Sequence, residues 1–198
     1  MKIFILSCFI AFTTTNLFSQ DKKDLSISLG AGVFNSPYYT NAKARPFYTF
    51  DFSYNISKRH IIATSFLAGK HFYYDNIRSN NAVPLTTPGY EKNTNATAEY
   101  LTFSILYKYN LYNNNKLSIT AGTGAGIMSQ TMIYPYTEGN SVYFRQSNWD
   151  DLVFPLRLEF DHRLSGRLKI GLIGGFFIHP DYPVLGYHAG LRLSYVIQ

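Results

Sequence analysis

The sequence has a single cysteine and few charged residues. Cys8 lies within the first ten positions, so an internal disulfide is excluded and thiol chemistry carries no functional signal. Charged residues form 15% of the chain, whereas soluble domains average roughly 25%. Basic residues exceed acidic ones by six but are scattered singly, which argues against nucleic-acid binding. A folded chain with so few charges would be poorly solvated in water.

The sequence also lacks an apolar run long enough for a membrane-spanning helix. The apolar run at residues 3–12 is about half of the roughly 20 residues that a spanning helix needs. It follows a basic start, Met1-Lys2, and precedes a small and polar stretch at 13–20, which is the layout of a secretory signal peptide. We therefore predict a cleaved signal peptide over 1–20 and one domain over 21–198, in preference to a helical membrane anchor.

Alternation of apolar and polar residues is abundant. In LTFSILYKYN, residues 101–110, apolar and aromatic residues fall mainly on odd positions and polar residues mainly on even ones, and this period of two predicts a β-strand. Eight strands of about ten residues make the smallest membrane barrel. The pattern recurs in eight segments: 25–34, 46–56, 60–74, 100–111, 117–128, 151–162, 168–177 and 185–197.

The connections between these segments alternate in length. Those after the second, fourth and sixth segments are short turns, at 57–59, 113–115 and 165–166. Those after the odd-numbered segments are mostly longer, at 35–44, 75–99, 134–150 and 179–184. Short turns at one rim and long loops at the other are typical of outer-membrane barrels, with the turns in the periplasm.

The two faces of the segments differ in bulk. The polar face is mostly Gly, Ser and Thr, which fit the inside of a narrow barrel, and the apolar face is large, as lipid contact requires. In a soluble lipocalin-like barrel the polar face would lie in water and carry long Lys and Glu side chains. We therefore predict an all-β, eight-stranded, antiparallel up-and-down transmembrane β-barrel in the outer membrane, with the soluble barrel around an apolar ligand as an alternative.

Charged residues on the predicted inward face need partners. Counted along their strands they fall in a layer roughly 10 Å deep, where an unpaired buried charge would cost several kcal/mol. We predict a salt-bridge network that plugs the lumen, with Arg157 and Arg192 facing Asp51 and Glu159; an ion pore or a proton path is the alternative. The inward charges are Asp51, Lys108, Arg157, Glu159, Asp161, Lys169 and Arg192.

Aromatic residues gather near the ends of the segments. Amphipathic rings prefer a membrane interface, so we predict two girdles, with a sugar-binding or base-stacking platform as the alternative for the outer one. The outer set is Tyr38, Tyr39, Tyr48, Phe72, Tyr73, Tyr74, Tyr100, Tyr134, Tyr136, Trp149, Phe176 and Tyr187; the periplasmic set is Tyr54, Tyr107, Tyr109, Tyr112, Phe160 and Tyr195.

The strand pattern and the closing segment, GYHAGLRLSYVIQ, resemble the small bacterial outer-membrane β-barrel family, such as the transmembrane domain of OmpA and OmpX. The frequency of Asn and Tyr is similar to that of proteins from Bacteroidetes. The resemblance implies contact with outer-membrane lipid and lipopolysaccharide, insertion by the barrel-assembly machinery, and a structural, adhesive or ligand-binding role through the outer loops. The chain departs from the family by ending in Gln198 and not in phenylalanine.

A lipid A deacylase is the enzymatic alternative, because some eight-stranded barrels modify lipid A. That family's pattern has a histidine and a serine two residues apart on a strand, and none of the five histidines fits it. A dispersed triad that uses His71 or His179 with a serine such as Ser141 is the remaining enzymatic possibility. Two potential ligands, His179 and Asp181, are too few for a metal signal. We expect no catalytic centre, no metal and no cofactor.

Overall fold

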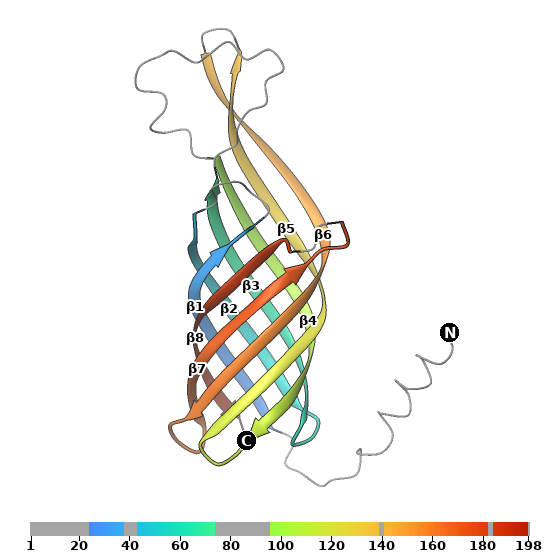
Figure 1. Ribbon diagram of the computed structural model, residues 1–198, viewed down its shortest axis with the longest axis vertical. Helices are drawn as coiled ribbons and strands as arrows, with labels where there is room; N and C mark the ends of the chain where they lie inside the picture. The colour runs from blue at the N-terminus through green and yellow to red at the C-terminus, as the bar shows by residue number, and fades with distance from the viewer. Residues whose placement is uncertain (1–23, 38–42, 74–95, 139–140, 182–183, 198) are drawn as a thin grey trace, which may run out of the picture.

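The computed structural model describes residues 24–37, 43–73, 96–138, 141–181 and 184–197, so the predicted signal peptide lies outside the described residues. Eight antiparallel strands form a closed barrel in which each pairs with its neighbours in sequence (Figure 1). No helix in the described part of the chain is long and apolar enough to cross a membrane. The strands are β1 Leu25–Asn35, β2 Arg45–Asn55, β3 His60–Tyr73, β4 Ala96–Asn113, β5 Leu117–Glu138, β6 Ser141–Arg163, β7 Leu168–Ile178 and β8 Gly186–Ile197.

The predicted fold class is confirmed. Strand β1 pairs with β8 from Leu25 opposite Ile197 to Asn35 opposite Tyr187, and this pairing closes the barrel. The bounds of β1, β2, β3, β7 and β8 agree with the predicted segments to within one residue. The period of two therefore reflects an inside and an outside surface.

The outer surface of the barrel is a belt of large apolar side chains. Leu29 and Leu101 are each 58% exposed, and Leu191 is 62% exposed. Between Leu101 and Ile105, the inward Thr102 and Ser104 are buried. Such a continuous apolar belt is foreign to soluble proteins and suits lipid, so it contradicts the alternative of a soluble barrel.

The rim with the three short turns, here called the turn rim, is shaped by side chains that cap the turns. Asn114 Oδ1 accepts hydrogen bonds from the backbone N–H groups of Lys116 and Leu117, at 2.8 and 2.6 Å. Ser165 Oγ accepts in the same way from the N–H of Leu168 at 3.1 Å. Asn and Ser end strands because their side chains satisfy nearby backbone groups in place of the sheet.

The predicted loop at 134–150 is wrong, because most of it is strand. Strands β5 and β6 remain paired as far as Glu138 opposite Ser141, and they project together beyond the opposite rim, here called the outer rim (Figure 1). We call this projecting hairpin, residues 134–150, the β5–β6 ribbon. Its sequence has no regular apolar alternation, so hydrophobic periodicity could not reveal it.

The outer half of the lumen is filled by an apolar and aromatic cluster. Phe34 and Phe47 are fully buried, and the ring of Phe34 lies 5.1 Å from that of Tyr100. The placement of Tyr100 in the outer girdle is wrong: it is 2% exposed, because it shares the inward face of β4 with Thr102. Small side chains therefore line only part of the lumen. The cluster is Phe34, Phe47, Leu67, Ala98, Tyr100, Met128, Met132, Val153, Ile173, Phe177 and Leu185.

Candidate functional site

A layer of ion pairs crosses the lumen on the turn-rim side of the aromatic cluster. Arg157 Nη1 lies 2.7 Å from Asp51 Oδ2 and 2.9 Å from Asp51 Oδ1. Arg192 Nη1 lies 2.9 Å from Glu159 Oε2. The sequence grouped these two bases with these two acids, without assigning which base faces which acid. The structure brings together six of the seven predicted charges, here called the ionic layer: Asp51, Lys108, Arg157, Glu159, Asp161 and Arg192.

Glu159 is the hub of the ionic layer. Its Oε1 lies 2.7 Å from Lys108 Nζ and 3.8 Å from Arg157 Nη1, and its Oε2 contacts Arg192. Arg192 Nη1 also contacts Asp161 Oδ2 at 2.7 Å. The charges come from β2, β4, β6 and β8, so the layer ties alternate strands of the barrel together across its axis.

Hydroxyl groups and charge balance make the burial of this layer tolerable. Arg157 Nη2 donates to Ser65 Oγ at 2.7 Å, and Arg192 Nη2 donates to Ser28 Oγ at 2.8 Å. Three acids face three bases, and each of the six is at most 5% exposed. Buried charges are retained where partners and hydrogen bonds replace water. The ionic layer is therefore close to neutral as a unit.

Glycines on the inward face of the barrel make room for the long charged side chains. A Cβ added at Gly122 would lie 2.9 Å from Lys108 Cγ, and one at Gly171 would lie 2.5 Å from Asp161 Oδ1. Real side chains do not approach so closely, so any larger residue would displace the ion pairs. These glycines serve packing, and they lie within strands, unlike the glycines of phosphate-binding loops.

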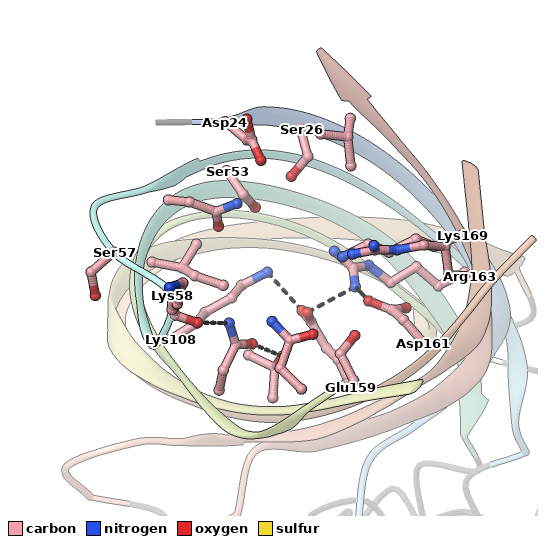
Figure 2. A pocket seen from close by; sticks show the side chains of 18 of the residues that line it. Asp24, Ser26, Ser53, Ser57, Lys58, Lys108, Glu159, Asp161, Arg163 and Lys169 are labelled. Carbon is pink, nitrogen blue, oxygen red and sulfur yellow. Dashed lines mark hydrogen bonds and ion pairs between the residues drawn. The ribbon is translucent and has the colours of Figure 1, made fainter. Parts of the chain in front are cut away.

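Lys169 is the predicted charge that the ionic layer does not include. It makes no ion pair within the described part of the chain, and it lines a cavity of about 490 Å³ between the ionic layer and the turn rim (Figure 2). The cavity wall also includes Lys58 from a turn and Arg163 from the end of β6. Sequence reasoning missed both because alternation does not extend to turns and strand ends. We call this cavity the turn-rim cavity; its other wall residues include Asp24, Ser53, Asn55, Asn110, Thr120, Glu159, Asp161 and Arg192.

The turns beside this cavity are basic. By sequence, the turns at 56–59, 114–116 and 164–167 carry Lys58, Arg59, Lys116 and Arg167, and no acid. Arg59 lies on the outer surface, where its Nη1 donates to the Tyr109 hydroxyl at 3.2 Å. The positive charge of the turn rim is thus divided between the cavity wall and the outer surface.

His179 is the outer-rim histidine that the sequence marked as a possible catalytic base. Its Nε2 lies 3.5 Å from Asp151 Oδ1, and its Nδ1 accepts a hydrogen bond from the backbone N–H of Asp181 at 3.1 Å. Both ring nitrogens therefore face protein groups. His188 lies inside the barrel, with its ring 5.1 Å from Phe47 and 5.5 Å from Phe177. The side chain of His71 lies outside the described residues.

Solved structures share this fold at low sequence identity. The attachment invasion locus protein Ail of Yersinia pestis, in complex with the heparin analogue sucrose octasulfate, is 12% identical over 89% of this chain and 100% of Ail, with a TM-score of 0.57. The outer membrane protein OprG of Pseudomonas aeruginosa is 10% identical over 90% of this chain and 99% of OprG, with a TM-score of 0.54. Neither a protein-family model nor a curated protein matches the sequence. The predicted likeness in fold to the small outer-membrane barrels is confirmed.

Proposed function

We propose that this integral outer-membrane β-barrel is a closed scaffold that presents the β5–β6 ribbon to a partner outside the cell. Outer-membrane barrels place short turns in the periplasm, so the turn rim faces the periplasm and the ribbon faces outward. The apolar belt contacts outer-membrane lipid and lipopolysaccharide in this proposal, and the barrel-assembly machinery inserts the chain.

The projecting ribbon is the observation that carries this proposal. Strand β5 pairs with β4 only as far as Ile133 opposite Thr97. Strand β6 pairs with β7 only from Phe154 onward, so among the described residues 141–153 pair with β5 alone. At about 3.3 Å per residue this one-sided segment is roughly 40 Å long. A membrane span does not require such an extension, whereas a binding surface held by a rigid scaffold uses it.

The contents of the lumen support a closed barrel. The ionic layer and the aromatic cluster lie one above the other, and the members of each are buried. An ion pore or a proton path would require both layers to open. We expect no stepwise current from the reconstituted wild-type chain in a planar lipid bilayer; discrete channel openings would contradict the closed barrel.

The geometry of His179 supports a role without catalysis. A hydrolase needs an imidazole nitrogen free to accept the proton of its nucleophile, and both nitrogens of His179 are directed at protein partners. In our proposal the protein therefore does not modify lipid A. The alternative hypothesis, a lipid A-modifying enzyme, predicts that the mass of lipid A changes when the gene is deleted.

Charge does not favour a sulfated ligand like the one bound to Ail. The four outer connections of this chain, by sequence, hold six acids and four bases, so they lack the basic excess that a polyanion requires. The ribbon sequence instead holds three Tyr, two Asn and one Gln. Aromatic and amide side chains suit a protein or an uncharged glycan.

The proposal is tested by shortening the ribbon. Residues 135–144 are replaced by Asn-Gly, which joins the paired positions Tyr134 and Arg145 through a tight turn. Cells that display either form are applied to immobilised proteins and glycans. We expect the shortened form to lose adhesion while its unboiled band still migrates faster on a gel, as a folded barrel does.

A matched variant shortens the connection at 75–95 and keeps the ribbon. It should adhere as the wild type does. If adhesion survives loss of the ribbon but not loss of the 75–95 connection, the ribbon is not the contact surface and this proposal is wrong.

A further inference from the structure

We propose that the turn-rim cavity is a binding site for a small anion from the periplasm, carrying carboxylate or phosphate groups. The site lies at the opposite end of the barrel from the ribbon, so it is independent of the role proposed for the outer surface. Its volume of about 490 Å³ falls in the range of small-molecule pockets, about 300–1,000 Å³. The ionic layer forms its floor (Figure 2).

Charge on the cavity wall points to an anion. The ionic layer contributes equal numbers of acids and bases, so the other wall residues decide the sign. They include Lys58, Arg163 and Lys169 against the single acid Asp24. Strands β6 and β7 hold Arg163 and Lys169 directly opposite each other, and Figure 2 shows both on one wall beside Asp161. Two adjacent cations on the wall of a concave site attract anions more strongly than cations on an open surface do.

Unused hydrogen-bond donors on the floor are a second, independent observation. Arg192 is 5% exposed and its Nε has no hydrogen-bond partner among the described residues; Ser53 is 3% exposed and its Oγ also has none. Both residues line the cavity. An acceptor on this wall, Asp161 Oδ1, has no partner among the described residues either. Buried polar groups normally have partners, and an anion that also carries a hydroxyl group would supply acceptors for the two donors and a donor for this oxygen. Asn55, Asn110 and Thr120 add polar groups for the uncharged part of a ligand.

Two other ligands fit this site less well. A metal ion would need several clustered ligands, and the described residues contain no group of three His, Cys, Asp or Glu that could hold one. A phospholipid headgroup lies on the lipid side of the strand wall, which is the side where Arg59 donates to the Tyr109 hydroxyl. The wall therefore separates such a headgroup from the cavity. The periplasmic solution is therefore the source of the proposed ligand.

The test is a titration of the full-length barrel in lipid nanodiscs with inorganic phosphate and, separately, with citrate at constant ionic strength. Binding is followed by amide chemical shifts and by calorimetry. We expect saturable shifts at the wall of the cavity, around Ser53 and Lys169. Lys169→Gln and Arg163→Gln should each weaken binding by about fivefold or more, because each removes one of the two facing cations.

Lys116→Gln is the matched control, because it removes one positive charge from the same rim at a residue outside the cavity wall. It should leave the affinity unchanged. Preference for phosphate or for citrate assigns the chemical class. The proposal is overturned if neither anion shifts the resonances of the cavity, or if Lys116→Gln weakens binding as much as Lys169→Gln. The shortened ribbon should bind the anion normally, so a failure here is distinct from a failure of the outer surface.

Discussion

Replacing Arg157 with methionine tests whether the ionic layer is a dry structural core. Arg157 Nη1 contacts both oxygens of Asp51, which is 1% exposed. The other cation near Asp51 is Lys108, at 3.5 Å, and Lys108 also serves Glu159 at 2.7 Å. Arg157→Met would leave Asp51 under-compensated. We expect the free energy of unfolding to fall by about 3–5 kcal/mol, as for other buried pairs that lose one partner.

The double variant Arg157→Met with Asp51→Asn separates the pair interaction from the loss of either residue. It removes both charges, so its loss of stability should be smaller than the sum of the two single losses by about 1–3 kcal/mol. Arg59→Met on the outer surface is the control, and it should cost at most about 1 kcal/mol.

The measurement is denaturant unfolding in lipid vesicles, followed by fluorescence of Trp149, which is the single tryptophan and is 46% exposed near the outer rim. If Arg157→Met costs less than about 1 kcal/mol, or if the cycle is additive, water screens the layer. The reasoning from burial would then be refuted.

Three further outcomes follow from other parts of the barrel. Ile105→Arg, on the lipid-facing surface, should lower stability by about 2–4 kcal/mol, and Leu111→Arg near the turn rim by about 0–1 kcal/mol; equal losses would contradict a lipid belt. Gly126→Val should abolish the faster gel migration, because a Cβ at Gly126 would meet Ser104, whereas the outward Ala125→Val should be tolerated. His179→Ala should leave the lipid A mass spectrum unchanged, and a changed spectrum would favour the enzymatic alternative.

The barrel was predictable because lipid and lumen impose opposite demands on neighbouring residues. Leu101 is exposed because it faces outward, and Thr102 is buried because it faces the lumen. The alternation of apolar and polar residues in the sequence follows this difference. The same parity placed Arg157 and Asp51 inside. It could not show that Lys169 lies too near the turn to join the ionic layer, because that depends on the register of β7 against β6 and β8.

Alternation could not predict strands where both faces of a strand meet the same surroundings. In our proposal the ribbon beyond Ile133 lies outside the membrane, so its residues need no apolar side, and the sequence at 134–150 resembles a loop. The predicted girdle position of Tyr100 is wrong for another reason. Tyrosine suits a membrane interface as well as a packed interior, and only the even position of Tyr100 on β4 indicates that its side chain faces inward. Lys58 and Arg163 reach the cavity from turn residues and a strand end, where no periodicity operates.

The ionic layer also constrains the order of events during folding. Arg192 and its partner Ser28 are separated by 164 positions along the chain, and Arg157 and Asp51 by 106. Contacts between such distant residues form late and slowly. Until β8 pairs with β1, the barrel is not closed around the guanidinium of Arg192, and this group must remain hydrated. We therefore expect these charges to remain hydrated until the β1–β8 seam closes, and closure of this seam to remove the water from the ionic layer.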